Sequence, residues 1–510
     1  MKREWDEHIE ASNSGSNFTR RVLLQRVGMV IAANAVPPVE NASAQPVISA
    51  SDVPSAGHGG AVMDELSAYM SAARDRSLPA DVVEATKQHT LDTLAAIVSG
   101  SQLAPGKAAI KFARSYGGEK ISTVVCSNVL CGPIEAALAN GMLAHSDETD
   151  DSHAPSDSHP GCSIVPAALA VGERFGVDGA HLLRSVALGY DIGTRVNMTL
   201  GVTEFQVGGH ASSHTVAGSF GSAAAGASAA GLSAQQMRWV IDYTAQQAAG
   251  LTVWQRDTEH IEKAFAFAGM PARNGVTSAM VVQSGWTGVG DVLSGQYNFV
   301  HAFSPNANPS GLVDKLGERY EIVRTNFKKW TVGSPIQAPL DALANLQKRH
   351  PFDADQVKQV VVKIAPAEGG LVNNREMPDI CLQYMVAVML LDRTASFRSA
   401  HDKARMQDPA VVRQRAKVQF VPDDELTALL PARVAIVEVT LTDGTRLTER
   451  VAAVRGTAQN PMTREEVVDK ARDLMEPVLG KEPCAKLIDK VLALDSVKDI
   501  RELRPLLQLF

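Results

Sequence analysis

The amino-acid sequence predicts a mainly helical protein with a second domain of mixed α and β structure. From Val62 to about Val300, apolar residues recur at the three- and four-residue spacing typical of amphipathic helices. After residue 321 the sequence contains short runs of β-branched residues, which favour strands. The chain of 510 residues is long enough for two domains, because single hydrophobic cores seldom grow beyond roughly 250 to 300 residues.

Helices are expected throughout the first domain, residues 62–320. The clearest runs from Pro79 to Val98, because a proline stands near its start and Gly100 follows its end. Further helices are expected at residues 133–144, 166–175 and 218–231. The last of these is so rich in Ala, Gly and Ser that it must pack very closely against its neighbours.

The second domain is expected at residues 321–459 as an α+β lid. Val357–Ile364 and Ala435–Leu441 are rich in β-branched residues and are predicted to be strands. The pair Asp443-Gly444, followed by Thr445–Val451, is typical of a β-hairpin.

Beyond Pro461 the pattern returns to helical periodicity, at residues 463–479 and 485–494. Residues 460–510 are therefore expected to form C-terminal helices that pack back on the helical domain.

The first 60 residues are predicted to direct export. Arg20-Arg21 followed by Val22–Leu24 resembles a twin-arginine signal, and Ala42-Ser43-Ala44 fits a cleavage site. Residues 1–44 would then be a signal peptide, 45–61 a linker, and the mature protein periplasmic. No later segment has the roughly 20 apolar residues that span a bilayer, so no membrane anchor is expected after export. The alternative is a disordered tail on a cytoplasmic protein.

The charge and the cysteine content limit the classes of partner and cofactor that can be expected. The net charge of −7 at pH 7 gives no broad cationic field, so nucleic acid is not an expected partner. A small anion that binds in a local basic pocket is an expected partner. The five cysteines show neither a CxxC pair nor the Cys/His spacing of a zinc or iron–sulfur site. No cofactor and no metal are expected.

The residues that indicate chemistry lie in one acidic segment, from His145 to His159. It contains five carboxylates and three histidines: Asp147, Glu148, Asp150, Asp151 and Asp157, with His145, His153 and His159. Closely spaced carboxylates raise one another's pKa and histidine titrates near neutrality, so the segment could supply both halves of acid–base catalysis. A solvated acidic loop, a Ca²⁺ or Mg²⁺ site and a zinc site remain open from the residues alone.

At these residues the chain resembles the MmgE/PrpD family, which includes 2-methylcitrate dehydratase, cis-aconitate decarboxylase and iminodisuccinate epimerase. The family pattern NG…AHxxDxDDTH…HPG is matched by Asn140-Gly141, Ala144-His145, Asp150-Asp151, Ser152-His153 and His159-Pro160-Gly161. Further matches are Gly189–Val196, Gly218–Gly221, Lys328–Trp330 and Gln383-Tyr384. The resemblance implies an all-helical core domain with a smaller α/β lid, a homodimer, and cofactor-independent chemistry on a small polycarboxylate.

The resemblance also implies roles for individual residues. His159 would transfer protons, and Glu148, Asp150, Asp151 and Ser152 would line the same catalytic pocket. Contacts with the substrate are expected from Lys328, His153, His210, His214, Lys263, Arg273 and Tyr384. Lys328 would face the substrate carboxylates.

The sequence departs from the family pattern at three places. Glu148 stands where the family usually has Asp. Ser212 stands where it often has His, although His210 and His214 flank that position. Near residue 260 the usual Lys-x-Leu-His-x-Gly stretch is replaced by a different one, in which His260, Lys263 and Arg273 are candidate anion contacts.

The expected activity is that of a hydro-lyase acting on a di- or tricarboxylate, with an epimerase and a decarboxylase as alternatives. All three reactions need a positioned acid–base group and a cation beside the reacting carboxylate. The departures at Glu148 and Ser212 keep open a different class, a periplasmic carboxylate-binding protein without catalysis.

Overall fold

The computed structural model describes residues 60–201 and 203–509. The predicted signal peptide, residues 1–44, lies outside the described residues, as does nearly all of the predicted linker. Within the described ranges, no helix combines the length and the apolar character needed to cross a bilayer. The described residues are mainly helical and include a small mixed sheet, as the sequence predicts.

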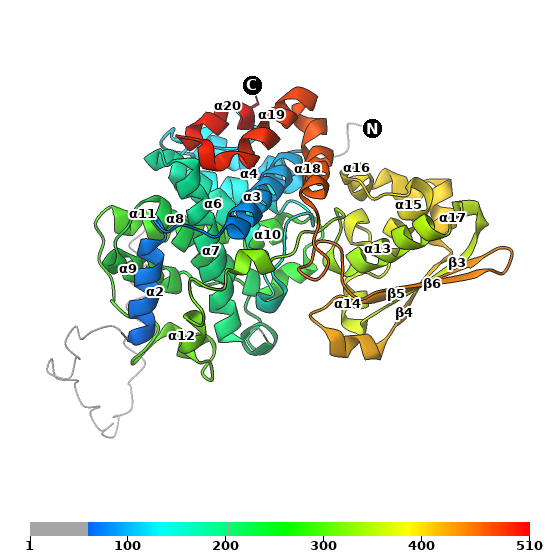
Figure 1. Ribbon diagram of the computed structural model, residues 1–510, viewed down its shortest axis with the longest axis horizontal. Coiled ribbons are helices and arrows are strands. Elements are labelled where there is room, and N and C mark those ends of the chain that lie inside the picture. The colour runs from blue at the N-terminus through cyan, green and yellow to red at the C-terminus, as the bar shows by residue number, and fades with distance from the viewer. Residues whose placement is uncertain (1–59, 202, 510) are drawn as a thin grey trace, which may run out of the picture. The chain divides into compact units, whose positions relative to one another are not determined.

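The first part of the described chain consists of helices packed along one another (Figure 1). They are α2 Ala61–Ala72, α3 Ala80–Gly100, α4 Ala104–Tyr116, α5 Pro133–Ala144, α6 Gly161–Phe175, α7 Gly179–Leu200, α8 Ser213–Ala229, α9 Ala234–Gln246, α10 Ile261–Ala264, α11 Met270–Gln283 and α12 Phe299–Phe303. The helices α6, α7 and α11 all pack on α8, and every residue of α8 is buried. This confirms the predicted close packing of the Ala- and Gly-rich helix.

Glycines allow α7 and α8 to approach closely. A Cβ atom on Gly193 would lie 2.4 Å from the carbonyl oxygen of Ala217, and one on Gly221 would lie 2.8 Å from the carbonyl oxygen of Gly189. Contacts this short are not tolerated in a close-packed interior, so side chains at these positions would push the helices apart. His214, in the first turn of α8, is buried.

Two predicted helices start earlier than the sequence indicates. The helix α6 begins at Gly161, and Pro166 lies inside it. Proline favours the first turn of a helix, which is why Pro166 was expected at the start; inside α6 it removes one main-chain donor. The helix α8 begins at Ser213, because the hydroxyl of Ser212 accepts a hydrogen bond from the Thr215 N–H and caps the helix.

The mixed sheet has the strand order β4-β3-β5-β6. Its strands are β3 Val357–Ile364, β4 Val418–Pro422, β5 Ala435–Leu441 and β6 Arg446–Val451. The strand β3 runs parallel to β4 and antiparallel to β5, and β5 forms a hairpin with β6. The two strands and the hairpin predicted from the sequence are confirmed. The short strand β4 was not predicted, since it has only five residues and ends on a proline.

Helices cover this sheet and complete the α+β part of the chain. They are α13 Ser334–Arg349, α14 Pro366–Val372, α15 Leu382–Asp392, α16 Phe397–His401 and α17 Pro409–Arg415. The helix α13 packs on β5 and β6, and α15 packs on β4. A separate pair of short strands, β1 Ser122–Thr123 and β2 Leu130–Cys131, lies in the helical part.

The chain ends in helices, of which the first two lie beside α3 (Figure 1). They are α18 Arg464–Leu479, α19 Lys481–Leu492 and α20 Arg504–Leu507. A buried ion pair supports this contact, because the Lys470 ammonium of α18 lies 2.7 Å from a carboxylate oxygen of Asp92 on α3.

Candidate active site

The acidic segment is a buried connection between α5 and α6. His145 is the C-cap residue of α5, Gly161 opens α6, and residues 145–151 between them are all buried. This burial rules out the alternative of a solvated acidic loop. Buried charges must be paired, so the partners of these carboxylates define the site.

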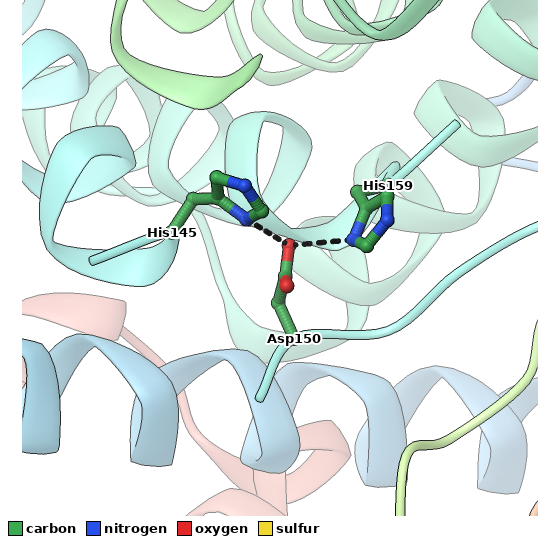
Figure 2. A group of neighbouring side chains, drawn as sticks. All are labelled: His145, Asp150 and His159. Carbon is green, nitrogen blue, oxygen red and sulfur yellow. Dashed lines mark hydrogen bonds and ion pairs between the residues drawn. The ribbon is translucent and has the colours of Figure 1, made fainter. Parts of the chain in front are cut away.

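Asp150 lies between two imidazoles. Its Oδ2 atom is 2.9 Å from Nδ1 of His145 and 3.2 Å from Nδ1 of His159, as Figure 2 shows. Burial alone would raise the pKa of Asp150, but the two histidines and Lys328 outweigh burial and hold it well below its usual range. Asp150 is therefore an ionised carboxylate that orients both rings.

Two lysines from distant parts of the chain meet the same segment. The Lys328 ammonium lies 3.5 Å from Oδ1 of Asp150 and 3.5 Å from Oε2 of Glu148, and Lys263 of α10 contacts Oε1 of Glu148. Burial opposes the ionisation of Glu148, but the two lysines hold its pKa well below the usual value. Burial would also lower the pKa of Lys328, yet Asp150 and Glu148 raise it, so its ammonium stays protonated.

Four histidines lie close together, three of them against Phe267, and we call them the histidine cluster: His145, His159, His214 and His260. The rings of His145 and His214 stack on Phe267 at centroid distances of 4.5 and 3.7 Å. His159 lies 5.3 Å from His145 and 5.2 Å from His214, and His260 lies 5.2 Å from His145. Side chains from the acidic segment, α8 and the residue before α10 thus form one group.

Three members of the histidine cluster, His159, His214 and His260, are held largely uncharged by their surroundings. Burial, together with nearby cations, lowers the pKa of His159, and it lowers the pKa of His214 and His260 further. Among the described residues, His145 Nε2, His214 Nδ1 and His260 Nε2 have no hydrogen-bond partner. His159 keeps 11% of its side chain exposed, whereas the other three histidines are classed as buried. His159 is therefore the member of the cluster most accessible to a substrate.

The α+β part contributes two titratable groups that the sequence did not indicate. His401 of α16 lies 3.2 Å from Oδ2 of Asp147, and this carboxylate outweighs burial and raises the pKa of His401 to about 9. Asp379 lies close enough to His401, Asp147 and Glu148 to feel their charges, and burial raises its pKa to about 6. Neither residue lies in a motif that would single it out.

The ion pair of His401 and Asp147 predicts a pH dependence of stability. Because the pKa of His401 is about 9 in the folded protein and 6.5 without its partner, the pair stabilises fully below pH 6.5 and is lost as the pH rises through 9. The free energy of unfolding should fall by on the order of 3 kcal/mol across this window. Urea unfolding at pH 6, 8 and 10 measures it. His401→Gln should remove that fall, and equal pH profiles for variant and wild type would contradict the assignment.

Behind the segment, Asp151 fixes the start of α6 next to His159. Its Oδ1 accepts the Gly161 N–H at 2.9 Å, and its Oδ2 accepts the Tyr190 hydroxyl at 2.5 Å and lies 2.9 Å from Nδ1 of His89. Asp151 therefore positions the segment from the opposite side and does not face the histidine cluster.

Lys470 anchors the same segment from α18. Its ammonium donates to the Thr149 carbonyl at 2.7 Å, between the two paired carboxylates Glu148 and Asp150. This contact could not be predicted from the sequence, because residue 470 is far from the segment in the chain and lies in an ordinary amphipathic helix.

Besides Asp151, five residues predicted for the site make contacts outside the histidine cluster. His153 is buried against Ser156 and Glu321, at 2.8 and 3.3 Å. The main chain of Ser152 pairs with that of Asn326. These contacts hold the segment in place, and those of His153 occupy both nitrogens of its ring.

The other three make contacts of their own. His210 is exposed in a left-handed backbone conformation, with φ 56°. The Arg273 guanidinium donates to Oδ1 of its neighbour Asn274 at 2.9 Å. The Tyr384 hydroxyl donates to the Ser399 carbonyl at 2.8 Å, within the core of the α+β part. Their positions therefore do not support the predicted contacts with a substrate.

Two sets of side chains are close enough together to hold a metal ion. They are His145, Asp150 and His159, and His145, Glu148 and His260. In each set a lysine ammonium already lies beside the carboxylate, and it would repel a second cation there. We therefore assign no metal ligands among these residues.

Comparison with known proteins places this site in a family context. Residues 64–311 match the MmgE/PrpD N-terminal domain, and residues 330–496 match the MmgE/PrpD C-terminal domain. The chain belongs to the MmgE/PrpD family. Both family domains supply site residues: the acidic segment, His214, His260 and Lys263 lie in the first match, and Asp379 and His401 in the second. Lys328 falls in the connection between them.

Several members of the MmgE/PrpD family are similar over most of their length. A cis-aconitate decarboxylase-like protein of Aspergillus oryzae is 26% identical over 486 residues, which cover 88% of this chain and 97% of that protein. The cis-aconitate decarboxylase of Homo sapiens is 26% identical over 451 residues, or 84% of this chain and 90% of the relative. That of Mus musculus is 24% identical over 454 residues, or 84% and 89%.

Proposed function

We propose that the protein is a lyase that acts on a small di- or tricarboxylate by proton transfer at His159. The observation that carries this proposal is the arrangement of His159, Asp150 and Lys328. A partly accessible imidazole is held by an ionised carboxylate, and a protonated ammonium lies on the other oxygen of that carboxylate. An acid–base group beside a fixed cation is what chemistry next to a substrate carboxylate needs.

Lys328 is the group that we expect to bind a substrate carboxylate. Its ammonium is buried, and no hydrogen bond within the described residues uses its donors, since both of its carboxylate contacts are as long as 3.5 Å. A substrate carboxylate can therefore take hydrogen bonds from Lys328 without displacing one. The same ammonium would stabilise negative charge that develops next to that carboxylate during the reaction.

Decarboxylation is the form of lyase reaction that the relatives favour, because those compared are named cis-aconitate decarboxylase or are like it. In this reaction the bond between carbon and the departing carboxylate breaks, and the electron pair stays on the substrate carbon as CO₂ leaves. Protonated His159 then delivers its proton to that carbon.

Dehydration is the second candidate, and the lowered pKa of His159 favours it. An uncharged His159 is a base, which would take the proton from a carbon next to a carboxylate. A second group would return a proton to the leaving hydroxyl, so that water departs. The two reactions therefore need opposite protonation states of one residue.

Product analysis separates these forms. The purified full chain is incubated with cis-aconitate, citrate and 2-methylcitrate, and proton NMR follows each mixture. Loss of CO₂ identifies the decarboxylase and loss of water the hydro-lyase. Thermal stabilisation by these compounds without any conversion would instead support a carboxylate-binding protein and contradict the proposal.

Activity is expected to be independent of added metal. The carboxylates Glu148 and Asp150 are already neutralised by lysines, so chelation should remove nothing that the reaction uses. Turnover after dialysis against EDTA should stay within about twofold of the untreated rate, a change far smaller than the loss of a catalytic group. A loss of more than tenfold that Mg²⁺ or Zn²⁺ restores would contradict this assignment.

A further inference from the structure

The charged groups at the candidate site balance one another before any substrate binds. Lys263 and Lys328 lie on Glu148 and Asp150, and His401 lies on Asp147. Three cations thus meet three carboxylates, and Asp379 adds a further carboxyl group. Among the described residues that face the site, no cation is left over to neutralise an incoming anion.

A polycarboxylate would bring two or three negative charges into this balanced and buried site. An uncompensated charge in a protein interior costs several kcal/mol, so binding must be accompanied by a compensating change. The cheapest change is protonation of a neighbouring imidazole, because one unit of pKa shift corresponds to only about 1.4 kcal/mol. A carboxylate within hydrogen-bond distance raises the pKa of histidine in the required direction.

The histidine cluster is built to accept that proton. His145 Nε2, His214 Nδ1 and His260 Nε2 are buried nitrogens without a hydrogen-bond partner among the described residues. Each could hydrogen-bond a carboxylate oxygen as a donor, and an imidazolium has a donor on both of its nitrogens.

The other titratable groups that face the cluster are already engaged. The acidic segment contributes Glu148 and Asp150, and α6 contributes Cys162. The other elements packed against the cluster contribute Lys263 of α10, Lys328 of the connection between the family domains, and Asp379 and His401 of the α+β part. The carboxylates and cations are paired with one another, and burial keeps the Cys162 thiol protonated by raising its pKa. Asp379 is the other group able to gain a proton near neutrality.

We propose that a polycarboxylate binds to this site together with about one proton, which the histidine cluster takes up. This inference rests on the proposed function, because it concerns the same site and the same class of ligand. Binding then supplies the acid that decarboxylation needs: His159, His214 and His260 are uncharged while the site is empty, and one imidazolium lies beside the bound substrate. The affinity for the ligand falls as the pH rises.

Calorimetry of binding tests the coupling with propane-1,2,3-tricarboxylate, which has neither a hydroxyl group to lose nor a double bond. Titrations of the full chain in phosphate and in Tris, between pH 7.0 and 8.5, keep the ligand itself ionised. Because the release of a proton from Tris absorbs much more heat than its release from phosphate, uptake of about one proton makes the two binding enthalpies differ by the difference in buffer ionisation heat. The dissociation constant should also rise by about tenfold per pH unit.

Variants show which side chains take up the proton. The double replacement His214→Gln and His260→Gln should abolish most of the buffer dependence and weaken binding at pH 7 by about tenfold. His301→Gln, at an exposed histidine of α12, should change neither quantity. If Asp379→Asn removes the uptake and the double histidine variant keeps it, the proton goes to Asp379 and the assignment to the histidine cluster is overturned.

The wild-type titrations test the coupling even if a variant fails to fold. Equal binding enthalpies in both buffers, with a dissociation constant that does not change with pH, would overturn this inference and leave the proposed function standing. Absence of binding by propane-1,2,3-tricarboxylate, citrate and succinate alike at every pH would overturn the proposed function itself.

Discussion

Replacement of His159 by Gln is expected to lower kcat by at least about a hundredfold. His159 is the most accessible ring of the histidine cluster, and Asp150 holds its Nδ1 at 3.2 Å, which leaves Nε2 as the nitrogen that can face a substrate. Glutamine can still hydrogen-bond but cannot transfer a proton. Initial rates with whichever polycarboxylate the product analysis identifies measure the effect.

A matched control separates this loss from general damage. His350→Gln changes an exposed histidine at the end of α13 and should leave kcat within about twofold, a change too small for a catalytic group. The thermal midpoint of His159→Gln should stay close to that of the wild type, because a partly exposed ring is replaced by a polar side chain of similar size. Retention of more than half of the wild-type kcat would remove His159 from the mechanism.

Replacement of Lys328 by Met should lower kcat/KM by about a thousandfold, since it removes the cation expected to bind and stabilise the substrate carboxylate. The replacement also leaves the buried carboxylates Glu148 and Asp150 without the positive charge of Lys328. Breaking a buried pair in this way typically destabilises a protein by about 3 to 5 kcal/mol. The thermal midpoint should therefore fall together with activity.

The adjacent lysine provides the control. The Lys329 ammonium lies 4.6 Å above the ring of Trp330 and belongs to no ion pair of the site. Lys329→Met should keep kcat/KM within about threefold, far from the loss expected at a catalytic cation. Lys328→Arg should recover most of the stability and less of the activity, because guanidinium keeps the charge in a different shape. Equal losses in Lys328→Met and Lys329→Met would contradict a specific role for Lys328.

Much of the fold could be predicted from local pattern. The strands β3 and β5 and the helix α5 begin and end at the predicted residues, because β-branched runs and an N-terminal proline are local signals. The start of α6 was missed because Pro166 imitates a helix start, and β4 because five residues next to a proline carry too weak a pattern. Pairing with β3 makes Val418–Pro422 a strand, and such pairing is a tertiary effect.

Only part of the candidate site could likewise be predicted from the sequence. The acidic segment and Lys328 could be found from the sequence, since one is dense in titratable groups and the other belongs to a recognisable motif. His401, Asp379 and Lys470 could not, because each reaches the segment only through the packing of distant helices.

A predicted contact, Tyr384, and a departure from the family pattern, Ser212, both have structural roles here. Tyr384 satisfies its hydroxyl inside the core of the α+β part, and Ser212, at the position where the family often has histidine, serves as a helix cap. Either residue type is common in such structural roles, so identity and spacing alone do not distinguish them from substrate contacts.

The central claim, that His159 exchanges a proton with a substrate carbon, is tested most directly by the reaction in D₂O. The wild-type protein should yield a product, or a recovered substrate, with one deuterium on a carbon next to a carboxylate, and His159→Gln should incorporate it at least about a hundredfold more slowly. Proton NMR with mass spectrometry locates the label. Binding of polycarboxylates without deuterium incorporation or conversion, or wild-type incorporation by His159→Gln, would contradict the account.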